Sequence, residues 1–376
     1  MNDRERWIRT MHFQPVDHVV DEEFSYWDQT PVVWRQQGMP DEIGRDIDLE
    51  TYFGFSKDAV VPTDFSIMPC FEARVLEETD RHRISIDSNG VKSISSMDGS
   101  ASIPKYLEFP VRDWDSWNDY KSRLRLDDPE RFYSDAQWAE FHKTWDNRDH
   151  RLGIYCGSMF GWVRDWMGFE NVSIACIEQP DLIEDMIEHS CNLSMKLIER
   201  PAKEFQLDYA HFWEDICFNK GPIISPKMFN EWVIPRYKRI TDFLKGYGVD
   251  VVSLDCDGNI NQLAPLWLEA GVNVMFPLEI RGGTDPYELR ARFGRSVLLK
   301  GGVDKTKIIE GKSAIRKEIN RLEKLVADGG FVPHMDHLCP PDVTFENYNY
   351  YLKTKREAFG IPEPAPWDER KKALGQ

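Results

Sequence analysis

Residues 249–299 read VDVVSLDCDGNINQLAPLWLEAGVNVMFPLEIRGGTDPYELRARFGRSVLL and decide the fold class. The pattern predicts strands at 249–254, 272–278 and 296–299, and helices at 260–270 and 285–293. The helices end at Gly271 and Gly294, because glycine readily terminates a helix. The strands are short and almost wholly apolar, as expected when both faces of a sheet are covered. Strands that alternate with helices predict parallel βα units.

The same rhythm extends in both directions, over residues 151–360. It predicts a strand at 208–212 with a helix at 226–244 that is kinked at Pro235, and later a helix at 312–328, a strand at 331–333 and a helix at 344–358. About six units follow residue 150, and one or two N-terminal strands would bring the total to eight. The sequence therefore predicts an α/β protein with a (β/α)8 TIM barrel. A doubly wound sheet is the alternative, but no G-x-G-x-x-G follows an early strand and no P-loop is present.

Residues 1–150 are irregular. The stretch Val16–Phe24 is a candidate first strand. Short strand patterns between about 72 and 96, with the turn signal Ser88-Asn89-Gly90, predict an antiparallel hairpin inserted into the N-terminal part. We expect residues 1–376 to form a single barrel domain with this insertion.

Composition excludes several function classes. The net charge is −17, with 41% hydrophobic and 30% charged residues and no basic stripe, which argues against binding nucleic acid or an anionic membrane. The seven cysteines are widely spaced without a CxxC, which is typical of a reduced compartment. The N-terminus has no apolar signal region, and no apolar run approaches the length of a membrane span. We expect a cytoplasmic protein that acts on a small molecule, with the oligomeric state open between monomer and homodimer.

Ionisable residues follow five consecutive predicted strands, at the ends where a barrel carries its chemistry. They are Trp213-Glu214-Asp215, Asp255-Cys256-Asp257-Gly258, Glu279, Lys300-Gly301-Gly302 and His334-Met335-Asp336-His337. Solvated loops would explain one or two such ends, whereas five in register favour a site. Proton chemistry, a hard metal, or a cationic or polyhydroxyl ligand fits this acidic set.

Individual residues keep alternative interpretations. Asp255 and Asp257 are two apart and would face the same way on a strand, as paired carboxylates or cation ligands, or they form a turn before Gly258. Cys256 between them would be a buried thiol. His334 and His337 are candidate metal ligands or acid/base groups, or else structural histidines, and Lys300 is an anion binder or a packing residue.

Several stretches resemble the uroporphyrinogen decarboxylase / corrinoid methyltransferase superfamily. They are TYFGF (51–55), LEFPVRDWDSW (107–117), RDWMGFENV (164–172), WEDI (213–216), ISPKMFNEWVIPRYKRI (224–240), GNINQLAPLWLEAGVNVMFPLE (258–279), LLKGGVDK (298–305) and GGFVPHMDHLCPPDVTFENYNYYL (329–352). The resemblance covers nearly the whole chain and implies a (β/α)8 barrel with its site at the carboxyl ends of the strands.

The resemblance implies two activities, and the residues depart from the pattern of both. The arginine-rich motif of the decarboxylases has only a weak echo in VVWRQQGMP (32–40). The zinc-binding His-x-Cys-Gly of the methyltransferases is matched by Asp255-Cys256-Asp257-Gly258, and the later cysteine falls at or near Asp336. Carboxylates thus replace both soft zinc ligands, which argues against a thiolate–zinc site and a thiol acceptor.

These observations predict a methyltransferase for a small methylated substrate, with the corrinoid supplied by a separate protein and no tightly bound cofactor. A decarboxylase acting on uroporphyrinogen or another carboxylate is the first alternative, and a non-catalytic ligand-binding barrel is the second. We expect catalytic roles for His337, Glu214 and Asp257, substrate contacts from Trp213, Asp215, Glu279, Lys300 and His334, and, if a divalent metal is bound, ligands from Asp255, Asp257 and Asp336.

Overall fold

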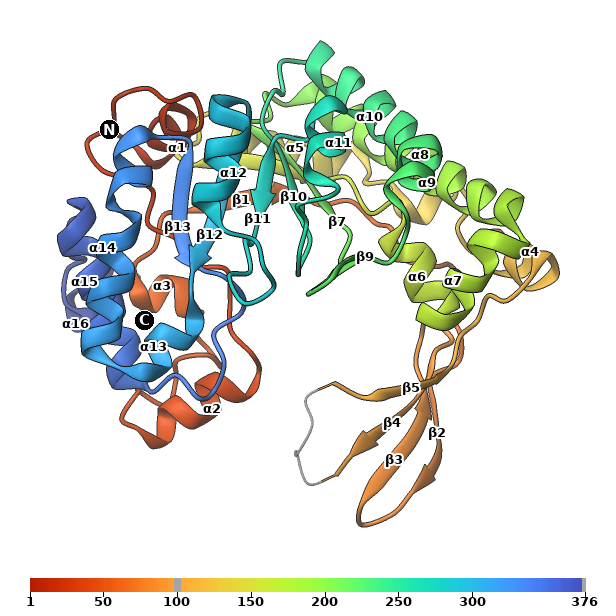
Figure 1. Cartoon of the computed structure of the whole chain (residues 1–376), viewed down its shortest axis with the longest axis horizontal. Helices are drawn as coiled ribbons and strands as arrows, with labels where there is room; N and C mark the ends of the chain where they lie inside the picture. Colours follow the sequence, from red (N-terminus) through yellow and green to blue (C-terminus); the bar gives the residue numbers. More distant parts are fainter. Residues whose placement is uncertain (98–102, 374–376) are drawn as a thin grey trace.

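The computed structural model describes residues 1–97 and 103–373 and is built on a curled parallel sheet with helices around its outer side (Figure 1). In the described part of the chain this sheet has seven strands, in the order β1-β6-β7-β10-β11-β12-β13. Their bounds are β1 Asp58–Val61, β6 Arg151–Tyr155, β7 Tyr209–Trp213, β10 Val252–Asp255, β11 Val274–Phe276, β12 Leu298–Val303 and β13 Phe331–Met335. All neighbouring pairs are parallel, so their carboxyl ends meet at one mouth.

Helices connect these strands and begin and end largely where capping residues allow. Their bounds are α1 Asp3–Met11, α2 Gln29–Gln36, α3 Leu49–Phe53, α4 Trp114–Ser122, α5 Asp135–Trp145, α6 Gly161–Met167, α7 Phe169–Glu178, α8 Pro180–Glu204, α9 Pro226–Met228, α10 Ile234–Gly246, α11 Ala264–Glu269, α12 Pro286–Phe293, α13 Lys305–Glu310, α14 Lys312–Asp328, α15 Phe345–Phe359 and α16 Trp367–Ala373. The Thr344 side chain, for example, accepts the Asn347 N–H at the start of α15, and Gly360 ends that helix with φ 69°.

The helix predicted at 226–244 is interrupted rather than simply kinked. The chain forms α9, then a π-helical turn over Phe229–Val233, and then α10. Pro235 lies in the first turn of α10, where its missing N–H has no helical partner to lose. The proline thus marks the start of a new helix.

The expectation of eight barrel strands is met in part. The candidate strand Val16–Phe24 has no ladder of its own, whereas β1, which the sequence analysis missed, is the first strand of the sheet. The extended segment that follows residue 18 nevertheless contacts both edges of the sheet. The Asp21 carbonyl accepts the Ser56 N–H just before β1, and Tyr26 forms a single parallel bridge with Cys339 just after β13.

The amino-terminal end of the curled sheet is closed by apolar side chains. Trp7 and Met11 of α1 pack against an inner layer of the strands, which contains Val251, Val274, Leu298 and Val332. Trp7 and Tyr209 also contact each other, with ring centroids 5.4 Å apart. Solvent and ligands therefore approach the interior from the carboxyl ends of the strands.

The predicted hairpin at 72–96 is part of a four-stranded antiparallel sheet that projects from the body (Figure 1). Its strands are β2 Arg74–Glu78, β3 His82–Ile86, β4 Lys92–Ser96 and β5 Lys105–Glu108. The Asp87 carboxylate accepts the N–H groups of Asn89 and Val91 and shapes the predicted turn. The prediction missed β5, whose four residues have no alternating pattern. A small hairpin, β8 Cys217–Phe218 and β9 Gly221–Pro222, follows β7.

Within the described residues, no helix is both long enough and apolar enough to cross a membrane.

Candidate functional site

The register of neighbouring strands brings four predicted site residues together at the mouth: Trp213, Asp215, Asp255 and Asp257. Asp255, the last residue of β10, is paired with Trp213 on β7 and with Phe276 on β11. Side chains of paired residues on neighbouring strands project to the same face of a sheet. Asp255 therefore lies between two aromatic residues, and Asp215 and Asp257 follow two residues beyond the ends of β7 and β10.

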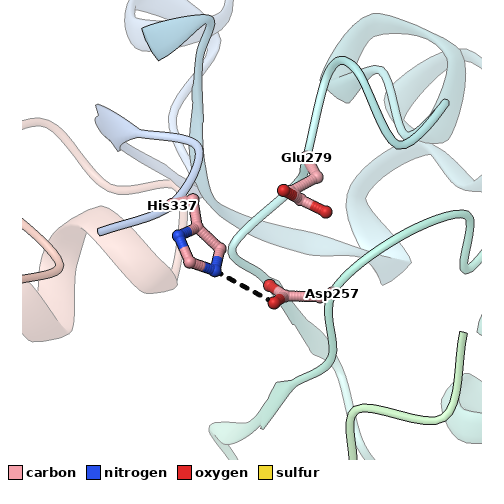
Figure 2. A group of neighbouring side chains, drawn as sticks. All are labelled: Asp257, Glu279 and His337. Carbon is pink, nitrogen blue, oxygen red and sulfur yellow. Dashed lines mark hydrogen bonds and ion pairs between the residues drawn. The ribbon is translucent and has the colours of Figure 1, made fainter. Parts of the chain in front are cut away.

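His337 and Asp257 form the central polar pair of this mouth. The His337 Nε2 lies 3.0 Å from the Asp257 Oδ2, although the two residues are 80 positions apart (Figure 2). The imidazole also stacks on the Trp27 ring, with centroids 5.7 Å apart. Burial lowers the pKa of His337, but the hydrogen bond and charge of Asp257 outweigh burial, so the pKa is raised from 6.5. The pair favours a protonated imidazole near neutral pH.

Glu279 lies close to both Asp257 and His337 (Figure 2). Its Oε1 accepts Lys305 Nζ at 3.1 Å, and its Oε2 accepts the Gly258 N–H at 3.0 Å. One ligand atom from each of Asp257, Glu279 and His337 lies within 4.8 Å of the others. Lys305 and His337 supply two positive charges, which balance the negative charges of Glu279 and Asp257. This group therefore needs no further cation.

A second group consists of Asp215, Asp255 and Asp257, and its negative charges are balanced less completely by nearby cations. Its ligand atoms also lie within 4.8 Å of one another. Among the described residues, neither Asp215 nor Asp255 makes an ion pair, and the buried Oδ1 of Asp257 has no hydrogen-bond partner. Burial and the charge of Asp257 raise the pKa of Asp215 to about 6, and burial and both neighbouring carboxylates raise the pKa of Asp255 well above its usual value. This group is poised to take up a proton or a cation.

The backbone of Asp215 is strained in a way that builds this group. Its φ is 49°, in the left-handed region that side chains other than glycine rarely adopt. In this conformation its Oδ1 accepts the Asp257 N–H at 3.1 Å, and its carbonyl accepts the guanidinium of Arg164. The conformation thereby ties the loop after β7 to the loop after β10.

Glu214 has a different position from its predicted partners. Its fully buried carboxylate accepts the N–H groups of Met159, Phe160 and Gly161 at 2.8, 3.0 and 2.6 Å, and also the Tyr237 hydroxyl. Burial raises its pKa and these hydrogen bonds lower it, with a net rise. The carboxylate anchors the start of α6, and the structure does not bring it into either acidic group.

Asp336 is likewise engaged with the backbone. It is fully buried, and its two oxygens accept the N–H groups of Ile280 and Lys305, each at 3.0 Å. Burial raises its pKa to about 6. It belongs to neither group of potential metal ligands, so the structure does not join it to Asp255 and Asp257. Cys256 between those two is buried, as predicted, and burial raises the pKa of its thiol.

Lys300 and His334 lie deeper, in the floor below the mouth. Lys300 pairs with the buried Glu22 at 2.8 Å and lies over the Phe276 ring, 5.1 Å from its centroid. The Nδ1 of His334 donates to the Met335 carbonyl at 2.7 Å, and its buried Nε2 has no partner among the described residues. Burial and the charge of Lys300 lower the pKa of His334 to about 3, so the imidazole is neutral.

Several residues of the mouth escaped sequence analysis. Trp27 reaches His337 from the irregular N-terminal segment, where no periodic pattern predicted its position. Arg164 lies over the Trp213 ring, 5.3 Å from its centroid, and only the stretch RDWMGF pointed to it. Tyr155 at the end of β6 also had a signal, since it closes an apolar strand at the same end of the barrel.

The donor set can be tested against the zinc that the resemblance implies. Oxygen and imidazole donors suit a hard or borderline divalent ion. Among the described residues neither group contains a cysteine, and Cys256 is buried with the pKa of its thiol raised by burial. The group with Glu279 is already neutralised by Lys305. The residues therefore do not fit a thiolate–zinc site.

One protein family model matches this chain over the region that carries both acidic groups. The family model described as uroporphyrinogen decarboxylase (URO-D) matches residues 156–358, more than half of the chain. The chain belongs to this family. The region matched by the family model includes β7 to β13 and therefore all the residues of both acidic groups.

One solved structure shows the same fold. A methyltransferase from Methanosarcina mazei matches 95% of this chain and 99% of its own length, with 14% identity and a TM-score of 0.57. A B12-independent methionine synthase from Shewanella sp. W3-18-1, in complex with selenomethionine, matches 84% of this chain and 77% of its own, with 12% identity and a TM-score of 0.37. This second likeness is too low to support an argument.

Proposed function

We propose that this URO-D family enzyme is a methyltransferase, which takes a methyl group from a small methylated substrate and passes it to a corrinoid held by a separate protein. The shared fold with a methyltransferase supports this choice. The observation that carries it is the His337–Asp257 pair at the mouth, because removing a methyl group from an ether oxygen requires a proton donor for the departing oxygen.

The chain's own residues supply that proton. When bound, a corrinoid in its cob(I) state would supply the nucleophilic cobalt for the methyl group, and the bonding electron pair would stay on the substrate heteroatom. Asp257 holds Nε2 of the His337 imidazolium and leaves Nδ1, on the other side of the ring, to donate to that heteroatom (Figure 2). The neutral imidazole that results still donates its Nε2 proton to Asp257, which keeps the ring oriented.

The charges of the mouth favour this reaction over decarboxylation of a polycarboxylate. Lys300 and Lys305 are paired with Glu22 and Glu279, so neither is free to bind a substrate carboxylate. Arg35, in the weak echo of the decarboxylase motif, donates to the Ile43 carbonyl. The carboxylates of the mouth would repel an anionic substrate.

The test uses free cob(I)alamin as methyl acceptor and a panel of methyl ethers and methylamines as donors, with methylcobalamin formation followed by absorbance. The wild-type chain should turn over at least one donor, and His337→Asn should lose about 10²-fold in turnover, the contribution of a general acid, with little change in melting temperature. His12→Asn is the matched control, because His12 pairs with Asp250 at the same 3.0 Å, beyond the opposite end of β10. No methyl transfer from any donor, or equal losses in the two variants, would contradict the proposal.

A further inference from the structure

The acidic group of Asp215, Asp255 and Asp257 lies among aromatic rings. Carboxylates and rings together indicate the class of ligand more narrowly than the carboxylates alone. In addition to Trp213 and Phe276 beside Asp255, the ring of Tyr155 belongs to this region, since Tyr155 ends β6 and is paired with His211 of β7. Trp213 and Tyr155 are only partly buried, whereas Phe276 is 6% exposed. Arg164 lies over the Trp213 ring, so a ligand would use the part of this ring that Arg164 leaves uncovered.

The rings form a continuous series along the mouth. Ring centroids of Tyr155 and His211 are 6.0 Å apart, and those of His211 and Phe276 are 6.1 Å apart. Phe24 contacts Phe276 at 4.4 Å and His337 at 6.1 Å, and Trp27 stacks on His337 beyond it. His211 and His334 in this series are neutral, because burial and Lys300 lower the pKa of each to about 3. The histidine rings of this series next to Phe276 are therefore neutral, whereas His337, at the other end of the series, pairs with Asp257.

Among the described residues, the nearby cations leave Asp215 and Asp255 without an ion pair, and only Asp257 of this group is paired, with His337. The charge of Arg164 lowers the pKa of Asp215, and the charge of Lys300 lowers the pKa of Asp255. Neither cation forms an ion pair with these carboxyls. Arg164 pairs with Asp165 instead, and Lys300 with Glu22. One oxygen of Asp215, both oxygens of Asp255 and the buried Oδ1 of Asp257 have no hydrogen bond from the described residues.

We propose that the mouth recognises a substrate through an ammonium group, quaternary or a protonated tertiary amine, which lies against Trp213 and takes the charges of Asp215, Asp255 and Asp257. The inference rests on the proposed function, because it names the substrate class of the same site. A diffuse organic cation is attracted to aromatic faces and to carboxylates together, whereas a small divalent ion needs oxygen ligands and gains nothing from the rings.

Asp257 connects this anchor to the proton donor. Its Oδ2 holds His337 and its Oδ1 is free for the cation (Figure 2). An ammonium group bound there would place the neighbouring atoms of the substrate within reach of the imidazole. The site thus separates recognition of charge from transfer of the proton.

The experiment measures binding to the full chain by titration calorimetry, without corrinoid. The probes are choline, its uncharged carbon analogue 3,3-dimethylbutan-1-ol, tetramethylammonium, and the chlorides of Mg²⁺, Mn²⁺ and Zn²⁺. We expect both ammonium ions to bind and the neutral alcohol to bind about tenfold more weakly or worse, since cation–π attraction and charge are both lost. This comparison uses wild-type protein and does not depend on the folding of a variant.

Variants test where choline binds. Asp255→Asn and Trp213→Leu should each weaken choline binding about tenfold. Asp250→Asn, beyond the other end of β10 and paired with His12, should leave it unchanged. The inference would be overturned if choline and the neutral alcohol bound with equal affinity. It would also be overturned if a divalent ion bound and choline did not, or if Asp255→Asn bound choline as tightly as the wild type. Choline binding without any methyl transfer would contradict only the proposed function, and methyl transfer from a neutral ether without choline binding would contradict only this inference.

Discussion

The carboxylates of this protein fall into two kinds according to what their oxygens accept. Glu214 and Asp336 accept backbone N–H groups in the interior, and Asp255 and Asp257 keep oxygens free at the mouth. The sequence predicted that all of them follow strands, which is correct, but the choice between anchoring a loop and facing a ligand depends on long-range partners. No local pattern encodes the contact between Glu214 and Met159, 55 positions away.

At the residue scale, the pH dependence of turnover tests the His337–Asp257 pair. The hydrogen bond and charge of Asp257 raise the pKa of His337 against burial, so Asp257→Asn should move the alkaline fall in turnover to lower pH. A raised histidine pKa also stabilises the fold below the ordinary pKa of 6.5, and this stability is lost as the pH rises through the raised value.

Thermal stability provides a control for this prediction. The difference in melting temperature between wild type and Asp257→Asn should be largest under acidic conditions and shrink as the pH rises. An alkaline limb that stays in place in Asp257→Asn would show that Asp257 does not set the pKa of His337.

Glu214 allows a second test at this scale, because its geometry distinguishes an anchor from a catalyst. Glu214→Gln keeps the shape but replaces a charged acceptor with an amide, and should cost about 1–3 kcal/mol of unfolding free energy through unsatisfied N–H groups at the start of α6. Folded variant protein should retain most of its turnover. Denaturant unfolding and turnover measured on one preparation check this, and normal stability with lost turnover would restore the catalytic role predicted from the sequence.

At the scale of elements, the βα units were predictable and the closure of the sheet was not. Strands such as β10 and β13 are apolar runs bounded by glycine or charged residues, and their helices end at capping signals. The segment near Val19 was expected to be a strand because it is apolar. It is extended in the structure, but side chains rather than a backbone ladder hold it, as when Glu23 accepts the Met335 N–H at 3.2 Å.

Lys355 of α15 provides the test of how this segment is held. Its fully buried Nζ lies 2.9 Å from Asp21 and 2.7 Å from Glu23. Lys355→Met should cost about 3–5 kcal/mol of unfolding free energy, because it leaves buried carboxylates without their cation. Lys353→Met, on the exposed side of the same helix with a 3.8 Å pair to Glu357, is the matched control and should change stability little. Equal effects in chemical denaturation would refute the role of the buried pair.

At the scale of the whole molecule, a parallel sheet brings distant loops to one mouth. Asp215, Asp257 and His337 belong to different loops, and their convergence follows from the order β7-β10-β11-β12-β13. The sequence predicted this convergence in outline, because the polar residues follow successive strands. It did not predict the contribution of Trp27, since the path of the irregular N-terminal segment depends on the finished barrel.

The central claim is that His337 and Asp257 act as one proton-donating unit at this mouth. A double-mutant cycle on methyl transfer to cob(I)alamin, with His337→Asn, Asp257→Asn and the double variant, measures it most directly. Residues that act as a unit give non-additive losses, so the double variant should lose turnover by about the same factor as His337→Asn alone. Losses that multiply in the double variant would mean that the two residues act independently and would contradict the account.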